Sequence, residues 1–200
     1  MEQRSKITKA KRGAHMKALL VIDFQNGFLQ LGDFSAEKEK VAKLIKVFTQ
    51  HKQPVLFIRH RDESSESPIA DGSEGGEIDS DILKYASDVI EKTTPSAFFK
   101  TDLQGKLQSL GVNHVFITGF NTEFCPQFTA IAAYDRGYKV TFVKDATATV
   151  NDDETYEFPG LDIRDFVGSV LHWSNVIEVL DYEEFLEEYG GGELMATRGE

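Results

Sequence analysis

Residues 18–26 have the sequence Ala-Leu-Leu-Val-Ile-Asp-Phe-Gln-Asn, and this stretch decides the fold. Its apolar residues follow one another without the polar alternation of a half-exposed strand. Such a run is typical of a strand that is covered on both faces, as in a parallel sheet. Asp23 comes directly after the run. The sequence therefore predicts a carboxylate at the carboxyl end of a buried strand.

Similar short apolar runs follow along the chain, and helical patterns separate them. After Ser35, the predicted N-cap, apolar side chains recur at helical spacing: Val41, Leu44, Ile45 and Phe48. This alternation indicates βαβ units. We predict an α/β fold, a single-domain doubly wound sheet of six mainly parallel strands in the order 3-2-1-4-5-6, with helices on both faces. The predicted strands are 17–22, 54–59, 88–91, 114–118, 139–144 and 175–180, and the further predicted helices are 102–110, 126–136, 163–171 and 182–188.

The length and composition fit one hydrophobic core. A chain of 200 residues with 40% hydrophobic composition can bury the core of one ordinary domain, which we assign to residues 16–189. Residues 1–15 are basic and poor in large apolar side chains, so we predict a disordered leader or a remnant of the expression vector. Residues 190–200 are predicted to be a flexible C-terminal tail.

The net charge and the single cysteine argue against several classes of protein. A net charge of -11 argues against the basic surface that binds nucleic acid or anionic membranes. No apolar run approaches the roughly 20 residues of a membrane-spanning helix, and a secretory signal is not apparent. We therefore expect a cytoplasmic protein. The single cysteine, Cys125, cannot form an internal disulfide, so its thiol is either a small core residue or a reactive group.

Polar residues follow the strands at the predicted switch point of the sheet. In the predicted order the first and fourth strands are neighbours, and ligands bind outside their carboxyl ends. Asp23 ends the first strand, and Cys125 lies in Gly-Phe-Asn-Thr-Glu-Phe-Cys-Pro at 119–126, after the fourth. These side chains are predicted to meet across one crevice. Lys92, after the third strand, can supply a cation there, whereas Lys100 lies near the start of a helix and is expected to be solvated.

Each of these three residues also has an ordinary structural interpretation. Asp23 could cap a turn, Cys125 could be a small buried side chain, and Lys92 could be a surface charge. The context of Cys125 favours chemistry, because Pro126 begins a predicted helix and places the thiol at its N-terminus. A helix dipole and a nearby cation both favour the thiolate there. We therefore predict a depressed pKa for Cys125.

Three segments carry a family resemblance. They are Val-Ile-Asp-Phe-Gln-Asn-Gly-Phe at 21–28, Lys-Thr-Thr-Pro-Ser-Ala-Phe-Phe-Lys-Thr-Asp-Leu at 92–103, and Thr-Gly-Phe-Asn-Thr-Glu-Phe-Cys at 118–125. Ala-Tyr-Asp-Arg-Gly-Tyr-Lys-Val at 133–140 and Lys-Asp-Ala at 144–146 follow in order. With this combination, the chain from about Met16 to Leu180 resembles the isochorismatase-like cysteine hydrolases, which include nicotinamidases and N-carbamoylsarcosine amidase.

The resemblance implies a catalytic site. It implies a triad of Asp23, Lys92 and Cys125, a cis peptide bond between Phe120 and Asn121, and an oxyanion hole formed by the N–H groups of Asn121 and Cys125. In the implied reaction the Cys125 thiolate attacks a carbonyl of a small-molecule substrate, Asp23 passes the thiol proton to the leaving amine, and water hydrolyses the thioester. The resemblance implies no organic cofactor. It also implies a homo-oligomer, since family members are commonly dimers or tetramers.

The chain departs from the family pattern at three places. Gly27 stands where the family often has an acid, and Pro126 stands where it usually has Val. The metal site of nicotinamidases needs an Asp-x-His pair with a further His, whereas this chain has His60-Arg61-Asp62 in that region. Because these ligands are too few, we expect no bound metal.

The sequence offers further candidate residues and leaves other functions open. The candidates for substrate binding are Phe28, His60, Phe98 and Phe124, although each Phe could belong to the core and His60 could cap a loop. The long 61–80 segment, rich in Ser, Gly, Asp and Glu, is expected to shape the pocket. Isochorismatases proper lack the nucleophilic Cys, so Cys125 favours amide hydrolysis. The alternatives are hydrolysis of a vinyl ether or imidic bond, and a noncatalytic metabolite-binding protein.

Overall fold

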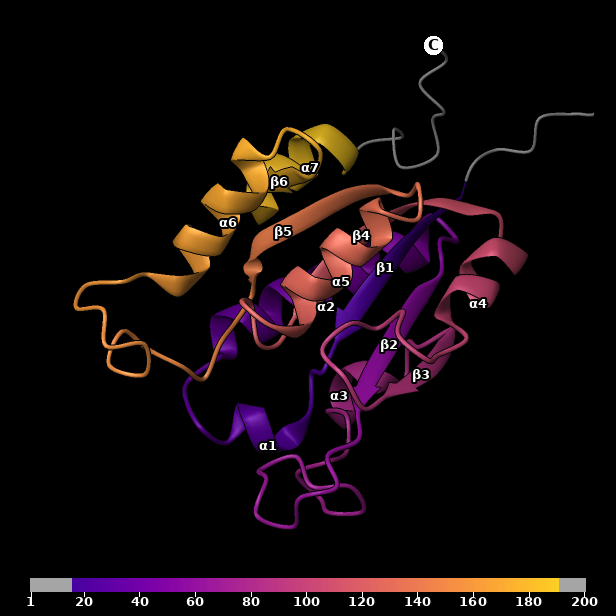
Figure 1. Ribbon diagram of the computed structural model, residues 1–200. Helices are drawn as coiled ribbons and strands as arrows, with labels where there is room; N and C mark the ends of the chain where they lie inside the picture. Colours follow the sequence, from indigo (N-terminus) through magenta and orange to yellow (C-terminus); the bar gives the residue numbers. More distant parts are fainter. Residues whose placement is uncertain (1–15, 191–200) are drawn as a thin grey trace, which may run out of the picture.

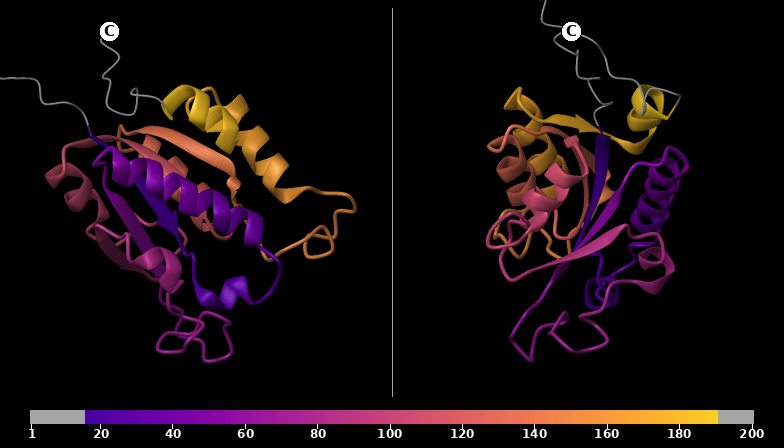
Figure 2. Two further views of the ribbon diagram at one scale, coloured as in Figure 1. Left: turned by 180° about the vertical axis from the view of Figure 1, so that it is seen from behind. Right: turned by 90° about the vertical axis from the view of Figure 1, so that its right-hand side faces the viewer.

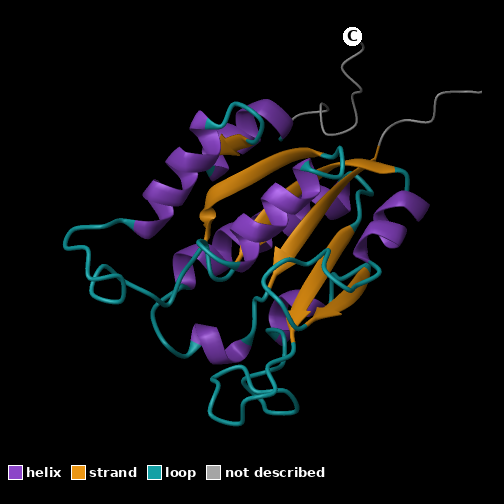
Figure 3. Cartoon of the chain, viewed as in Figure 1, coloured by secondary structure: helices purple, strands orange, loops and turns teal. Residues whose placement is uncertain are grey.

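The computed structural model describes residues 16–190, and a parallel sheet forms its centre (Figures 1 and 3). The strands are β1 Met16–Ile22, β2 Val55–His60, β3 Asp88–Lys92, β4 Val112–Gly119, β5 Lys139–Thr147 and β6 Glu178–Leu180. They form one six-stranded sheet in the order β3-β2-β1-β4-β5-β6. Every neighbouring pair is parallel. The predicted fold class and strand order are confirmed.

β1 occupies the middle of the sheet, and its side chains alternate between the two faces. Leu20 and Ile22 pack into the core on one face, and Leu19 and Val21 pack into the core on the other. Each of these residues is fully buried. Two covered faces explain why this stretch is continuously apolar, because neither set of alternate side chains meets water.

Helices cover both faces of the sheet, as predicted. The helices are α1 Asn26–Leu29, α2 Ser35–Gln50, α3 Ser80–Leu83, α4 Leu103–Ser109, α5 Cys125–Tyr134, α6 Ile163–Trp173 and α7 Tyr182–Tyr189. The buried side chains of α4, α5 and α6 belong to one core cluster, and those of α2, α3 and α7 belong to the other. The right-hand view of Figure 2 shows the sheet between these two layers.

The element boundaries differ from the predictions in places. Ser35 is the first helical residue of α2 rather than its cap, since the N-cap is Phe34. β6 begins at Glu178 and not at 175, because α6 continues to Trp173 and Asn175 then adopts a left-handed conformation with φ of 59°. The four-residue helices α1 and α3 were not predicted, since one turn is too short to show a helical period.

The two predicted chain ends lie largely outside the described residues. The basic leader at 1–15 is outside, and so is the predicted tail except for Gly190, which follows α7. Among residues 16–190, no helix combines the length and the apolar character that crossing a membrane requires.

Candidate active site

Four strand ends bring polar side chains together at one edge of the sheet. Asp23 follows β1, His60 ends β2, Lys92 ends β3, and Cys125 begins the helix after β4. His60 and Lys92 are register partners on neighbouring strands. β2 separates β3 from β1, so a residue on β3 needs a long side chain to reach Asp23. Lysine has such a side chain, with an apolar stem that can be buried along its path.

The ammonium group of Lys92 joins the other three side chains. Its Nζ lies 2.6 Å from Oδ2 of Asp23, 2.8 Å from Nδ1 of His60 and 3.2 Å from Sγ of Cys125. An ammonium has three N–H donors, and each of them has an acceptor here. Lys92 is 2% exposed and Asp23 is fully buried. Lys100, the other lysine of the segment, is exposed and lies over the ring of Phe99.

Burial decides the ionisation of the thiol. Loss of water around Cys125 raises the pKa of its thiol, the negative charge of Asp23 raises this pKa further, and Lys92 opposes the rise only in part. The predicted depressed pKa is therefore wrong for the free protein. A helix N-terminus and a nearby lysine both favour a thiolate, but the positive charge of Lys92 is already paired with Asp23. The resting site holds a neutral thiol beside a carboxylate and an ammonium.

His60 is neutral and has one tautomer in this arrangement. Burial lowers its pKa, and so does the ammonium of Lys92. Since an ammonium can only donate, Nδ1 of His60 accepts the hydrogen bond and the ring hydrogen lies on Nε2. The Nε2–H group is therefore a donor, and His60 lines the cavity beside Cys125.

A small cavity opens next to these residues. Its volume is about 240 Å³, and its lining residues are Asp23, Phe28, His60, Asp62, Ser67, Pro68, Ile69, Pro95, Asn121, Phe124 and Cys125. Of the predicted pocket residues, Phe28, His60 and Phe124 thus lie at the cavity. Phe98 does not: it is buried in the core, where its ring centroid lies 5.9 Å from that of Tyr138. Phe98 lies in the 92–103 segment. The sequence alone did not show whether its apolar side chain belongs to the core or to the pocket.

Comparison with known proteins shows the family to which this chain belongs. A model of the isochorismatase domain matches residues 17–173. The chain belongs to the isochorismatase family. Nicotinamidase 3 of Arabidopsis thaliana is 34% identical over 159 residues, which cover 72% of this chain and 79% of that protein. The isochorismatase family protein YddQ of Bacillus subtilis is 35% identical over 139 residues, covering 66% of this chain and 77% of that protein.

Solved structures of the family share the fold. The crystal structure of a putative isochorismatase from Burkholderia xenovorans has a TM-score of 0.80 and 27% sequence identity, and the match covers 90% of this chain and 89% of that chain. The chain is therefore an isochorismatase-family hydrolase with nicotinamidase relatives.

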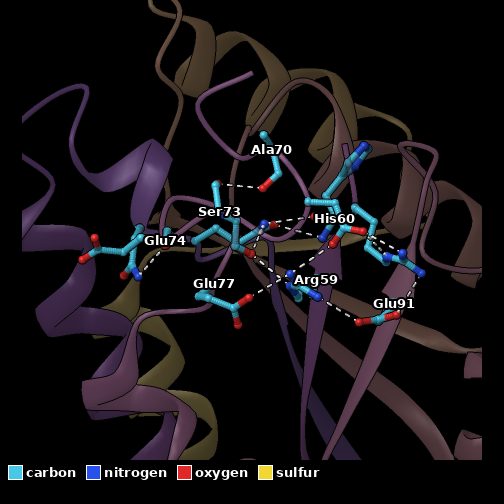
Figure 4. Close-up of polar contacts among 12 residues, drawn as sticks. Arg59, His60, Ala70, Ser73, Glu74, Glu77 and Glu91 are labelled. Carbon is cyan, nitrogen blue, oxygen red and sulfur yellow. Dashed lines mark hydrogen bonds and ion pairs between the residues drawn. The ribbon is translucent and has the colours of Figure 1, made fainter. Parts of the chain in front are cut away.

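The segment at 61–80 forms one wall of the cavity beside Cys125, and hydrogen bonds from Gln25 and Arg59 hold it in place. Gln25, in front of α1, donates from Nε2 to the carbonyl oxygens of His60 and Gly76. Arg59 of β2 donates to the Gly76 carbonyl and pairs with Glu77 and Glu91. Figure 4 shows Arg59 between these two acids. The expectation that this segment shapes the pocket agrees with its lining residues Ser67, Pro68 and Ile69.

Gly27, one of the departures from the family, lies against this wall. A Cβ atom at position 27 would be 1.9 Å from the carbonyl oxygen of Pro68, and the Gly27 N–H donates to the Gly75 carbonyl over 2.9 Å. Any larger residue, including the acid common in the family, would displace the wall. Glycine at position 27 therefore permits the 61–80 segment to approach helix α1 closely.

The peptide bond before Asn121 differs from the family expectation. The described residues contain no cis peptide bond, so the predicted cis bond between Phe120 and Asn121 is wrong here. The trans form is favoured by about 3 kcal/mol for a residue other than proline. A hydrogen bond positions the Asn121 side chain, whose Oδ1 accepts from the N–H of Val150 over 3.0 Å. Asn121 still lines the cavity beside Cys125.

Glu123 lies two residues before Cys125, and the sequence did not indicate a role for it. Its Oε1 accepts hydrogen bonds from Thr149 Oγ1 at 2.9 Å, Asn151 Nδ2 at 2.7 Å and the Tyr156 hydroxyl at 2.9 Å. Burial raises the pKa of Tyr156 to about 12, with Glu123 contributing. Glu123 thus ties the loop that carries Cys125 to the segment after β5. These partners are distant in sequence, so only the folded chain reveals them.

The metal of nicotinamidases does not fit the residues of this site. Asp23, His60 and Cys125 each offer one ligand atom, and these atoms lie within 4.8 Å of one another. However, each of the three side chains contacts the Lys92 ammonium. A metal ion in their midst would meet this fixed positive charge. Asp62, the nearby acid, already accepts a hydrogen bond from the N–H of Ser64.

Proposed function

We propose that this protein is a cysteine-dependent hydrolase that cleaves an amide-type C–N bond of a small molecule. The observation that carries the proposal is the contact of the Lys92 ammonium with both Asp23 and Cys125 at the edge of the cavity. A nucleophile, a base and a fixed charge within reach of one another are what covalent amide hydrolysis requires. The relative named nicotinamidase supports the same class of substrate.

Asp23 acts as the base in the proposed first step. The raised pKa of Cys125 means that the thiol must lose its proton as it attacks. Oδ2 of Asp23 binds Lys92, whereas its buried Oδ1 has no hydrogen-bond partner among the described residues. Asp23 accepts the thiol proton while Sγ bonds to the substrate carbonyl carbon. It then gives that proton to the nitrogen as the C–N bond breaks, so an amine or ammonia leaves and a thioester remains.

The second step hydrolyses the thioester. A water molecule gives a proton to Asp23 and its oxygen bonds to the acyl carbon, after which the C–S bond breaks and the thiolate regains the proton. The N–H groups of Asn121 and Cys125 are the proposed donors to the oxyanion in both steps, and such donors typically contribute about 3 kcal/mol each. Lys92 keeps a positive charge beside the transient thiolate throughout.

The cavity restricts the proposed substrate to a small molecule. Its volume of about 240 Å³ is below the roughly 300 to 1,000 Å³ of sites for drug-sized ligands. Phe28, Pro95 and Phe124 offer apolar contacts, and Nε2–H of His60 offers a hydrogen bond to an acceptor on the substrate. Small amides, carbamoyl compounds and ureides fit this description.

The test is ammonia release from a panel of such compounds by the wild-type protein and by Cys125→Ala. We expect release from at least one compound by the wild type and none above background by the variant. Acid quenching during turnover should leave the acyl group on the peptide that contains Cys125, as detected by mass spectrometry. Ammonia release by Cys125→Ala would contradict the proposal. Cleavage of a vinyl ether without any amide cleavage would support the alternative reaction, and binding without turnover would support the noncatalytic alternative.

A further inference from the structure

Asp62 is a carboxylate of the cavity that has no paired cation among the described residues. The cavity beside Cys125 is lined by two carboxylates, Asp23 and Asp62. The charge of Asp23 is paired with Lys92 at 2.6 Å, whereas Asp62 forms no ion pair with a residue that the structure describes. The described lining residues include no lysine or arginine. A molecule bound in the cavity therefore meets a negative charge.

The two arginines next to His60 along the chain bind acids that do not line the cavity. Arg61 donates from Nε and Nη2 to Oδ2 of Asp71 at 2.9 and 2.6 Å. Arg59 pairs with Glu91 at 2.9 Å. His60 itself lines the cavity but adds no charge, because burial lowers its pKa. These side chains therefore do not offset the charge of Asp62.

The carboxylate of Asp62 is held in place and ionised. Its Oδ1 accepts from the N–H of Ser64 over 3.0 Å, and its carbonyl oxygen accepts from the N–H of Asp71 over 2.8 Å. Hydrogen bonds from Ser64 and Ser67 lower the pKa of the carboxyl group. A carboxylate has about four acceptor positions, so two hydrogen bonds leave room for donors of a ligand.

We infer that the substrate carries a cationic nitrogen group, such as an ammonium, which Asp62 binds while the scissile carbonyl faces Cys125. The inference rests on the proposed amide hydrolysis for the identity of the bond that is cleaved. Hydrogen bonds from a cationic donor to a carboxylate are roughly twice as strong as those between neutral groups. A cleft lined by charge of one sign also concentrates ligands of the opposite sign.

The same carboxylate disfavours amides that carry a carboxylate of their own. Two like charges in one small cavity repel each other. The three N–H donors of Lys92 are already bound to Asp23, His60 and Cys125, so this ammonium does not bind an anionic substrate group. The selectivity thus combines attraction of one class of amide with repulsion of another.

The first experiment measures binding without turnover. Its ligands are amides of similar size: β-alaninamide carries an ammonium at neutral pH, butanamide is uncharged and succinamate carries a carboxylate. NMR titration of Cys125→Ala, which removes a neutral thiol and keeps the charge of the site, gives the Kd of each. We expect β-alaninamide to bind about tenfold or more tightly than butanamide, and succinamate to bind more weakly than butanamide.

Asp62→Asn tests whether this residue is responsible, and Glu66→Gln is the matched control. Asparagine keeps the size of the side chain and an oxygen that accepts from Ser64, but it carries no charge. Glu66 belongs to the same 61–80 segment, is exposed and does not line the cavity. Both changes remove one negative charge, so the comparison separates Asp62 from the net charge of -11. We expect Asp62→Asn to lose the preference for β-alaninamide over butanamide and Glu66→Gln to keep it.

The second experiment measures ammonia release from the same amides by the protein with Cys125 in place. We expect kcat/KM to follow the order of binding. Ammonia release from none of them, with the expected order of binding, counts against the proposed hydrolysis and supports the binding role of Asp62. Binding of succinamate as tight as that of β-alaninamide overturns the inference. So does an unchanged preference in Asp62→Asn or a lost preference in Glu66→Gln, once circular dichroism confirms folding.

Discussion

The ammonium of Lys92 lies 2.8 Å from Nδ1 of His60, so the site depends on a neutral imidazole. Protonated His60 would place a second positive charge against Lys92 and would remove one of the three acceptors of the ammonium. This contact connects a residue at the end of β2 with the Asp23 and Cys125 pair. The arrangement of all four side chains therefore requires a neutral His60.

The pH dependence of activity should reflect this condition. Because burial and Lys92 lower the pKa of His60 below its ordinary value of 6.5, the imidazole is neutral above that pH and gains its proton only below it. We expect kcat/KM to show no step from His60 above about pH 6.5 and to fall at lower pH. His60→Asn, whose amide oxygen can accept from Lys92 but does not titrate, should lack the part of that fall which comes from His60. An acid limb centred above about pH 6.5 that disappears in His60→Asn would contradict the assignment.

The lysines of the 92–103 segment should differ in their effect on turnover. Lys92→Ala leaves the buried carboxylate of Asp23 without its partner, so we expect kcat/KM to fall by about 10² or more. Lys100→Ala removes an exposed charge and should stay within a few-fold of the wild type. Both are measured on any accepted amide after circular dichroism confirms folding. Near-normal activity of Lys92→Ala would falsify the proposed triad.

The thiol should react slowly with alkylating agents at neutral pH. Burial raises the pKa of Cys125, so the rate of iodoacetamide alkylation should keep rising above the roughly 8.5 midpoint of an ordinary thiol. Free cysteine in the same buffer is the control. A midpoint below that of free cysteine would show that the thiolate is already formed in the resting protein.

Replacement of Gly27 should affect substrate binding more than chemistry. A Cβ atom at position 27 meets the Pro68 carbonyl oxygen, so Gly27→Ala displaces the wall formed by 61–80. We expect KM to rise with a smaller change in kcat, and stability to fall by about 1 to 3 kcal/mol. Gly72→Asn is the control, because position 72 has open space and a left-handed conformation that Asn tolerates. Unchanged KM and unfolding temperature in Gly27→Ala would show that the wall adapts freely.

Chelation should leave activity unchanged. The Lys92 ammonium contacts Asp23, His60 and Cys125, which are the residues whose donor atoms converge. We expect the same kcat/KM before and after dialysis against EDTA. Loss of activity that zinc or iron restores would mean that a metal replaces the ammonium contacts.

The fold could be predicted because it depends on local pattern. Continuous apolar runs such as 18–22 require two covered faces, and that requirement leads to a parallel sheet with a helix layer on each side. The strand ends then place Asp23, Lys92 and Cys125 at one edge. The exact ends of elements were less predictable, as at Asn175, where one left-handed residue ends the helical region.

The hydrophobic pattern and βαβ geometry of the sequence thus predicted the fold class and a crevice shared by Asp23 and Cys125, whereas the place of Lys92 in the same site was implied by the family resemblance. Tertiary structure alone decided how those side chains are ionised and what surrounds them. The pKa of Cys125 depends on burial and on the pairing of Lys92 with Asp23, and neither can be read from spacing along the chain. The place of Phe98 in the core and of Pro68 in the pocket wall likewise depends on packing between distant segments. Electrostatic and packing energies are set by distances in space, and these exist only once the chain is folded.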